Sequence, residues 1–434
     1  MCHARPQHDE GHQSHEAVRF FHAQHGDIAL RTTGLQSPQL SLALWFNAFA
    51  MASAKLFDFD TPIDRRNTAS AKWAKYHNPD VIPMWVADMD FACAPAIVDA
   101  LRQRVDHGIF GYSNPPAGLV DATIAHLQNE YGWEVQPDWI IWLPSLVVGL
   151  NVVCRAFGRE GDEVLTATPI YPPFLSAPVN AARHVVRVEM IESDGVWRWD
   201  IDALERAITP NSRLLLLCNP HNPVGRVFTR DELREIADVC VRHNLVLCSD
   251  EIHGGLILDT DKRHVPVATL GGDIAQQTVT LMSASKTFNL PALGCAYAIA
   301  ANAQLRAKLR KAMAGIVHHV GMMGYIATQA AYQDGKSWQL ALLDYLRSNR
   351  DLVVREVGRM PSLRVWHAEA TYLSWIDARA LRVDNATAFF EKAGVGLYDG
   401  ALFGANGYLR LNFAHPRALL EQALERMVRA ISKL

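Results

Sequence analysis

Cysteine is scarce in this chain. Seven cysteines occur in 434 residues, and none forms a Cys-x-x-Cys pair, so the sequence offers neither a thiolate zinc motif nor a disulfide framework. Cys218, Cys248 and Cys295 lie in or near apolar segments, where a free cysteine behaves as a small hydrophobic residue. We therefore expect a reducing, cytoplasmic environment and no metal site.

The chain also lacks an excess of charge of one sign, and it lacks an apolar run long enough to span a bilayer. The 42 basic residues nearly balance the 45 acidic ones, which disfavours nucleic acid and anionic membranes as partners. The apolar stretch 40–50 ends like a signal cleavage site. It is too short to span a membrane and follows too long a polar lead to act as an ordinary signal peptide.

The first fifty residues differ in composition from the remainder, which shows no internal repeat. They contain six histidines, and three of these would share one face of a helix: His8, His12 and His15. A metal site is the weaker interpretation of this pattern. We expect residues 1–54 to be a disordered extension or sequence upstream of the true start.

Lys286 is the most informative single residue. It follows the apolar run 278–282, which is β-branched at its start, too short for a helix and typical of a buried strand. A lysine just past such a strand can lose its proton through desolvation and become an amine nucleophile that forms a Schiff base. A solvated lysine in a strand-to-helix turn is the ordinary alternative, so this residue decides nothing alone.

Two other apolar runs end in polar residues. Residues 213–218 lead to Asn222, and residues 245–248 lead to Asp250. Between them, Thr229 and Glu232 form the capping box of a helix that stops near residue 243.

Strand, helix and strand with near-continuous apolar strands predict a parallel sheet covered on both faces. Ligands bind beyond the carboxyl ends of such strands. We therefore expect Asn222, Asp250 and Lys286 to lie at one edge of the sheet.

This amine, carboxylate and amide suit pyridoxal phosphate. Lys286 would hold the aldehyde, Asp250 would keep the pyridine nitrogen protonated, and Asn222 would donate to the phenolic oxygen. Each residue has an ordinary alternative, since Asn before Pro often only forms a turn and Asp after a strand is often a cap. A shared cofactor site is the better explanation for the three residues together, because otherwise three separate ordinary roles would have to coincide at one edge of the sheet.

Further stretches carry a family resemblance: residues 57–66, 84–91, 107–112 and 407–412. With the three motifs above, they make the region from about residue 56 to the C-terminus resemble fold-type I pyridoxal-phosphate enzymes. More narrowly, it resembles the MalY/PatB-type cystathionine β-lyases. The resemblance implies an α/β fold with a mostly parallel sheet flanked by helices in a large domain (98–335). A smaller α+β domain would combine residues 55–97 and 336–434, linked through a helix around 326–355.

The resemblance also implies roles for single residues. Tyr171 would stack on the cofactor and Arg410 would grip the substrate α-carboxylate, a task that suits a bidentate fork. Tyr112 would reach the phosphate from a neighbouring subunit, which implies a homodimer. The remaining implied contacts are His253, Leu146, Val147, Ser283 and Ser285 with the cofactor, and Ala87 with the substrate. Of these, Leu146 and Val147 open a helix whose free N–H groups and dipole can hold a phosphate.

Two features depart from the family pattern. Many relatives carry Gly six residues after the lysine and a polar residue eight after, where this chain has Ala292 and Gly294. The run 253–255 lacks an expected acidic residue near its end. Neither departure touches the three cofactor residues, but both concern the pocket wall.

The resemblance favours a carbon–sulfur β-lyase that acts on L-cystathionine or another cysteine S-conjugate and yields a thiol, pyruvate and ammonia. Lys286 would act as general base at Cα, and Lys286 or Tyr171 would protonate the departing sulfur. An aminotransferase built from the same residues remains an alternative. A regulatory protein that retains the cofactor and binds a partner is another.

Overall fold

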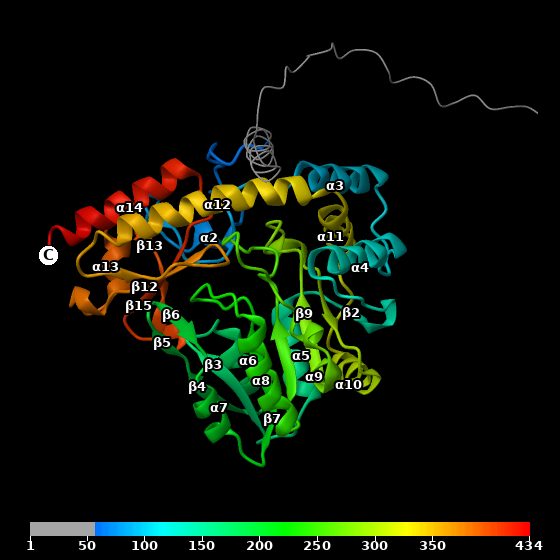
Figure 1. Cartoon of the computed structure of the whole chain (residues 1–434). Helices are drawn as coiled ribbons and strands as arrows, with labels where there is room; N and C mark the ends of the chain where they lie inside the picture. The colour runs from blue at the N-terminus through cyan, green and yellow to red at the C-terminus, as the bar shows by residue number, and fades with distance from the viewer. Residues whose placement is uncertain (1–56) are drawn as a thin grey trace, which may run out of the picture. The chain divides into compact units, whose positions relative to one another are not determined.

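The computed structural model describes residues 57–434, so the predictions for residues 1–54 and the histidines within them lie outside the described residues. The central element is a seven-stranded sheet in the order β2-β10-β9-β8-β7-β3-β4 (Figure 1). The strands are β2 (Ile140–Leu143), β3 (Glu163–Thr168), β4 (His184–Glu189), β7 (Ser212–Cys218), β8 (Val246–Asp250), β9 (Thr278–Met282) and β10 (Ala296–Ile299). Only β10, which pairs antiparallel with β9 and β2, breaks the parallel arrangement within this sheet.

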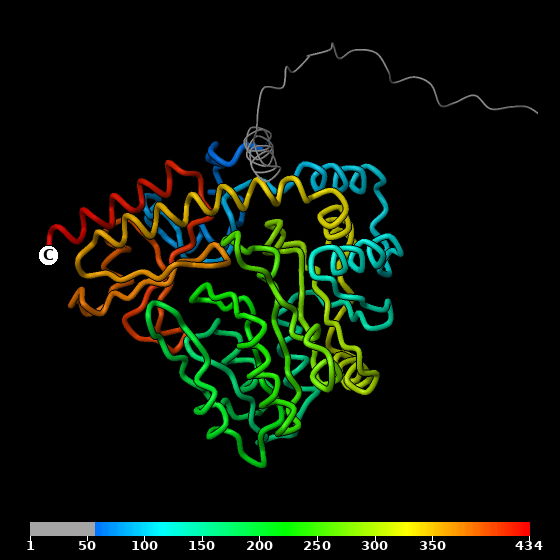
Figure 2. The backbone as a smooth tube through the Cα atoms, in the orientation of Figure 1, coloured from blue at the N-terminus to red at the C-terminus, as the bar shows by residue number. Residues whose placement is uncertain are grey.

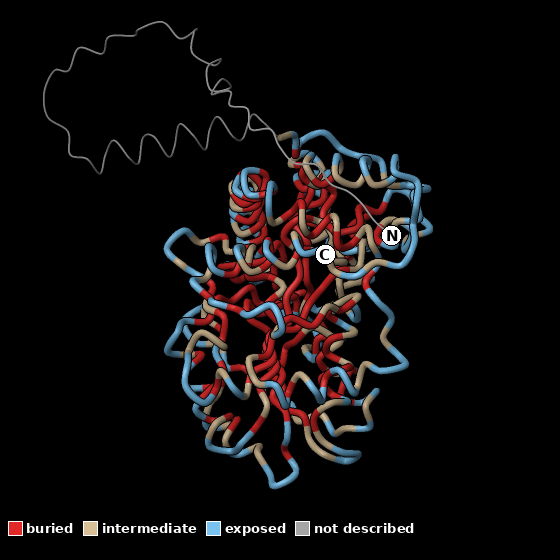
Figure 3. Tube along the Cα trace, turned by 90° about the vertical axis from the view of Figure 1, so that its right-hand side faces the viewer, coloured by how far each residue is buried: buried red, intermediate tan, exposed pale blue. Residues whose placement is uncertain are grey.

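Helices cover both faces of this sheet, and its central strands, such as β7 and β9, are buried along almost their whole length. On β7, Leu214 and Leu216 pack with one helical layer and Leu215 and Leu217 with the other. The first layer contains α5 (Leu146–Ala156), α6 (Pro173–Asn180) and α10 (Ala303–Met313). The second contains α7 (Ile201–Ala207), α8 (Arg230–Arg242) and α9 (Gly272–Gln277). The predicted parallel sheet with two covered faces is confirmed, and Figure 3 shows buried residues along its strands.

The helix boundaries follow local capping. The capping box predicted at Thr229 and Glu232 is present, and α8 ends with His243 as its C-cap. Ser145 is the N-cap of α5, and its Oγ accepts a hydrogen bond from Val148 N–H at 3.2 Å. This cap leaves the N–H groups of the first turn facing the carboxyl edge of the sheet.

A second core joins segments far apart in the sequence (Figure 2). Its sheets are β11 (Arg364–Val365), β12 (Leu373–Asp377), β15 (Tyr408–Asn412) and β14 (Tyr398–Asp399), plus β1 (Ile82–Pro83) paired in parallel with β13 (Val395–Gly396). The helices α2 (Ala71–Ala74), α12 (Lys336–Val357), α13 (Ala386–Lys392) and α14 (Arg417–Ile431) flank them. The remaining elements are α3 (Pro95–His107), α4 (Ala117–Tyr131), α11 (Met322–Asp334) and the hairpin β5 (Ile191–Ser193) with β6 (Val196–Arg198). The domain limits stay a prediction.

The single helix expected around residues 326–355 is wrong, because two helices, α11 and α12, meet at Gly335. A Cβ at this position would lie 2.5 Å from the Phe288 ring and would also contact the Ala331 carbonyl. The tight contact with Phe288, two residues from Lys286, explains why a glycine interrupts the helical run here. Within residues 57–434 no helix combines the length and the apolar character that a membrane crossing requires.

Candidate active site

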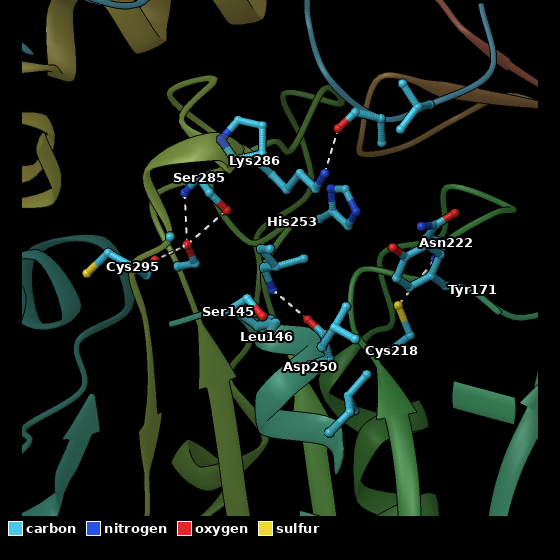
Figure 4. Close-up of a pocket in the computed structure, with 18 of the residues that line it drawn as sticks. Ser145, Leu146, Tyr171, Cys218, Asn222, Asp250, His253, Ser285, Lys286 and Cys295 are labelled. Atoms are coloured by element: carbon cyan, nitrogen blue, oxygen red, sulfur yellow. Dashed lines mark hydrogen bonds between the residues drawn. The ribbon is translucent and has the colours of Figure 1, made fainter. Parts of the chain in front are cut away.

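Three neighbouring parallel strands end at one cavity. Cys218 closes β7 and pairs with Asp250, which closes β8, and Asp250 pairs in turn with Leu281 of β9. Beyond these ends lies a cavity of about 210 Å³. Its lining contains eleven of the twelve side chains predicted for the site: Ala87, Leu146, Val147, Tyr171, Asn222, Asp250, His253, Ser283, Ser285, Lys286 and Arg410. Figure 4 shows how separate segments bring these residues around one space.

Lys286 lies directly after β9, in the turn that the sequence places there. Its Nζ donates a hydrogen bond to the backbone carbonyl of Ala87 at 2.5 Å. Burial, followed by the nearby charge of Arg410, lowers the pKa of Lys286 to about 8. A larger fraction of the amine is therefore neutral and nucleophilic at physiological pH than for an ordinary lysine.

Asp250 is a buried carboxylate without a cationic partner. Its Oδ1 accepts a hydrogen bond from Ile252 N–H at 3.1 Å, and no ion pair to it occurs among the described side chains. Burial raises its pKa to about 7. A carboxyl group held in this way favours a ligand that brings a positively charged N–H to it.

Arg410 is a buried guanidinium that makes no ion pair within residues 57–434 and is 1 % exposed. It donates to Asn222 Oδ1 and to the carbonyl of Trp85, each at 3.0 Å, and its Nε has no partner. Its Cζ lies 4.8 Å from the ring centroids of both Tyr398 and Phe403. Because an uncompensated buried cation is costly, this arrangement indicates a binding site for an anion.

The same contact fixes the orientation of Asn222. A guanidinium only donates, so the atom facing Arg410 is the amide oxygen and the Nδ2 group is left free to donate. Asn222 also lines the cavity. Its backbone carbonyl accepts from Tyr171 N–H at 3.2 Å, which ties the Tyr171 loop to the same edge of the sheet.

Tyr171 and His253 complete the aromatic part of the lining. Burial raises the pKa of Tyr171 and lowers the pKa of His253 to about 3. His253 is therefore a neutral imidazole, and its Nδ1 is buried without a partner. Both rings offer flat apolar surface to a planar ligand, and each retains a polar edge.

The opposite end of the cavity suits a phosphate. The first turn of α5 contributes Leu146 and Val147, and the helix dipole is positive there. Ser283 Oγ lies 2.7 Å from the carbonyl of Cys295 and 2.9 Å from Ser285 Oγ. Ser283 has one proton for these two acceptors, and both serine hydroxyls line the cavity, where they can contact a phosphate.

These features fit pyridoxal phosphate on chemical grounds. An amine of lowered pKa, a carboxyl that requires a cationic partner, an amide donor and a helix N-terminus match the aldehyde, ring nitrogen, phenolic oxygen and phosphate of that molecule.

The family model described as aminotransferase class I and II matches residues 79–427. The chain belongs to this family. It is 34 % identical to cystathionine β-lyase PatB of Bacillus subtilis (strain 168), over 86 % of this chain and all of that protein. It is 33 % identical to the protein MalY of Escherichia coli (strain K12), over 87 % of this chain and 99 % of that protein. The family resemblance inferred from the sequence motifs is confirmed.

Solved structures of family members are also similar. The structure of OvoB has a TM-score of 0.85 and 44 % identity, covering 87 % of this chain and all of that one. The structure of cystalysin from Treponema denticola, which contains a pyridoxal 5'-phosphate cofactor, has a TM-score of 0.83 and 32 % identity. It covers 87 % of this chain and 99 % of cystalysin.

Two asparagine side chains, Asn289 and Asn412, hold the segment 86–91 in place. This clamp was not predicted from the sequence. The Asn289 side chain makes three hydrogen bonds to the backbone of Met89 and Phe91, and Asn412 Nδ2 donates to the carbonyls of Val86 and Asp88. Asn412 lies in the stretch 407–412 already quoted, and Asn289 lies three residues after Lys286, which was the available signal. Their carboxamides fix the segment that presents the Ala87 carbonyl to Lys286.

Tyr372 was also missed, since no motif includes it. Its hydroxyl donates to the Ala87 carbonyl at 3.0 Å, so this carbonyl accepts from both Tyr372 and Lys286. Ala87, which is predicted to contact the substrate, therefore lies beside the Lys286 amine. The backbone carbonyl oxygen of Ala87 is the atom that faces this amine.

Tyr112 is the one predicted site residue outside the cavity lining. It lies between α3 and α4 with its side chain fully exposed, and Ile109 and Phe110 beside it are 65 % and 60 % exposed. The Tyr112 side chain is therefore exposed to solvent and does not contribute to the cavity.

The two departures from the family pattern have local explanations. At Gly255, a Cβ would lie 2.5 Å from Thr287 Oγ1, and its carbonyl accepts from Gln339 Nε2 at 2.8 Å. At Gly294, φ is +58° and a Cβ would lie 3.1 Å from the Pro144 carbonyl. Both glycines allow close packing around the turn that carries Lys286.

Proposed function

We propose that this chain is a pyridoxal-phosphate-dependent carbon–sulfur β-lyase that cleaves L-cystathionine or related cysteine S-conjugates to a thiol, pyruvate and ammonia. The observation that carries the proposal is the cavity in which Lys286, Asp250, Asn222 and the unpaired Arg410 meet. The names of the relatives PatB and cystalysin, with the cofactor that the latter contains, support the same activity and cofactor.

Lys286 and Asp250 serve the reacting end of the cofactor. Bound pyridoxal phosphate supplies an electron sink for the pair released when the substrate Cα–H bond breaks. Lys286 is the amine that holds the aldehyde carbon and then, once released, removes the Cα proton, for which a pKa of about 8 is well placed. Asp250 holds a proton on the ring nitrogen, and the charged ring in turn lowers the pKa of this carboxyl.

The remaining groups orient the substrate. Arg410 binds the α-carboxylate through the guanidinium atoms that lack an acidic partner. Asn222 donates from Nδ2 to the phenolic oxygen, since its Oδ1 is occupied by Arg410. Lys286 or Tyr171 delivers a proton to the departing sulfur, because both line the cavity.

A homodimer belongs to this proposal. The exposed apolar side chains of Ile109 and Phe110, together with Tyr112, form a surface that a second copy would cover. Tyr112 would then complete the phosphate end of the partner's cavity. A cytoplasmic location is part of the proposal as well, supported by free cysteines of which five are buried: Cys154, Cys218, Cys240, Cys248 and Cys295.

The deciding experiment follows the products formed from L-cystathionine by the purified protein. Equal release of pyruvate and free thiol is expected for wild-type protein. Lys286→Ala should lose the visible absorbance of lysine-linked cofactor and fall in rate by about 10²–10⁴-fold. The control Lys433→Ala changes an exposed terminal lysine and should keep both properties. Formation of a keto acid without thiol would instead identify an aminotransferase.

A further inference from the structure

Lys75 is a second cation, and it lies near the ring of Tyr398, a residue of the cavity lining. It is the C-cap residue of α2, and its Nζ lies 4.3 Å from the ring centroid of Trp85 and 5.9 Å from that of Tyr398. It makes no ion pair among the side chains of residues 57–434. An ammonium group resting on an aromatic face, without an acidic partner, retains its capacity to bind an anion.

Trp85 and Tyr398 also contact Arg410, Trp85 through its backbone carbonyl and Tyr398 through its ring. Trp85 and Tyr398 pack edge to face with centroids 5.5 Å apart. The Trp85 carbonyl accepts from Arg410, and the Arg410 guanidinium lies 4.8 Å from the Tyr398 ring. Because Tyr398 lines the cavity, this aromatic pair separates an inner cation, Arg410, from an outer one, Lys75.

The aromatic pair is held rigidly. Trp85 Nε1 donates to the Lys72 carbonyl at 3.1 Å, which ties the ring to α2. Tyr398 belongs to β14 and pairs with Arg410 of β15. Asp399 and Glu391 are the acidic groups near Lys75, and the Asp399 carboxylate accepts from Ala401 N–H at 2.9 Å instead of pairing with the lysine. The aromatic pair between the two cations is therefore held in place by the fold.

Two cations that share the Tyr398 ring suit a ligand with two anionic ends. We propose that Lys75 determines substrate specificity by binding a carboxylate at the far end of the S-substituent while Arg410 binds the α-carboxylate. The preferred substrates are cysteine S-conjugates whose departing thiol carries an acidic group. This inference rests on the proposed function for its substrate class.

A binding experiment tests the subsite without any turnover. Straight-chain α,ω-dicarboxylates and monocarboxylates of the same length are titrated into the cofactor-loaded enzyme by calorimetry. Wild-type protein should bind the best dicarboxylate about tenfold more tightly than its monocarboxylate. Lys75→Met should lose this preference without weakening the monocarboxylate, and Lys75→Arg should keep most of it. Lys433→Met, an exposed lysine at the C-terminus, is the matched control and should behave as wild type.

A kinetic experiment tests the link to catalysis. S-(2-carboxyethyl)-L-cysteine and S-(2-carbamoylethyl)-L-cysteine have substituents of nearly equal size and differ in one charge. Lys75→Met should raise KM for the first by about tenfold, leave its kcat unchanged, and leave both constants for the second unchanged.

The outcomes separate the two proposals. Equal dicarboxylate preference in wild-type and Lys75→Met protein overturns the subsite, whatever the enzyme does to thioethers. The same KM change for both thioethers also overturns it, because Lys75 would then act on structure in general. Dicarboxylate binding that depends on Lys75, combined with no thiol release from either thioether, overturns the lyase assignment and leaves the subsite supported.

Discussion

Arg410 donates a hydrogen bond to Asn222 Oδ1 across 3.0 Å, although the two residues are 188 positions apart in the chain. The contact joins the anion-binding arginine of β15 to the loop after β7 at the parallel sheet. It also decides which end of the Asn222 amide faces the cofactor position. In the function that we propose, substrate binding and cofactor tuning therefore share one hydrogen bond.

Replacing Asn222 with aspartate should weaken both substrate binding and the interaction with the cofactor. The carboxylate would pair with Arg410 and withdraw it from the substrate, and the Nδ2 donor would be gone. We expect KM for the amino-acid substrate to rise at least about tenfold and the visible band of the bound cofactor to shift. Asn211→Asp, which adds the same charge on an exposed loop, should change neither value. An unaltered KM in Asn222→Asp would contradict the role of this contact.

Asp250 should make the stability of the cofactor-free protein pH-dependent. Its pKa is about 7 in the folded chain against an ordinary value of 3.8, so the folded state binds more protons within this window. Its contribution to the free energy of unfolding is therefore fully present below pH 4 and is lost as the pH rises to 7 and beyond. Asp250→Asn should gain stability relative to wild type across the same range, on the order of 2–4 kcal/mol.

Denaturant unfolding of cofactor-free wild type and Asp250→Asn at several pH values measures this difference. Cofactor titration of the same variant should show the opposite effect, with weaker binding, because an amide cannot hold the ring-nitrogen proton. A pH-independent difference in unfolding free energy would show that Asp250 is ionised with little cost.

Gly255→Ala should destabilise the protein through one contact. Its Cβ would lie 2.5 Å from Thr287 Oγ1 and 3.0 Å from Thr287 Cγ2, which corresponds to overpacking worth about 1–3 kcal/mol. The Tm should fall, and the turn that carries Lys286 should shift. Thr287→Ala removes both atoms, so the double variant should lose less stability than the two single variants predict together. If the stability losses of the two single variants simply add in the double variant, the strain does not come from the contact between residues 255 and 287.

Tyr112 provides a test of the shared site. In Tyr112→Phe we expect cofactor affinity to fall about three- to tenfold through the lost hydroxyl contact, with no change in sedimentation. Co-expression with Lys286→Ala should produce hybrid dimers in which one cavity receives a normal Tyr112 from the Lys286→Ala chain. Cofactor affinity at that cavity should return to the wild-type value. If mixed preparations bind like Tyr112→Phe alone, the residue does not act across subunits.

The sequence predicted what depends on local pattern. The strand at 278–282, the cap at Thr229 and the helix start at Leu146 are all present, because apolar runs and capping residues act within a few positions. The shared edge for Asn222, Asp250 and Lys286 followed from the geometry of parallel strands.

Long-range contacts account for what was missed. Asn289 meets Met89 from 200 positions away and Tyr372 meets Ala87 from 285, and no local pattern encodes such pairs. The break at Gly335 depends likewise on the Phe288 ring, which packs against it from another segment. Gly335 interrupts an otherwise helix-forming run, so the pattern favoured one helix where tertiary packing produced two.

The clamp on residues 86–91 has a consequence for how the enzyme is made. Its anchors, Asn289 and Asn412, leave the ribosome long after the segment that they hold. The Ala87 carbonyl therefore reaches Lys286 only when nearly the whole chain is available, and long-range closure of this kind is slow. A nascent chain that already carries the reactive lysine thus lacks a finished pocket, and competence to hold the cofactor arrives as one of the last events of folding.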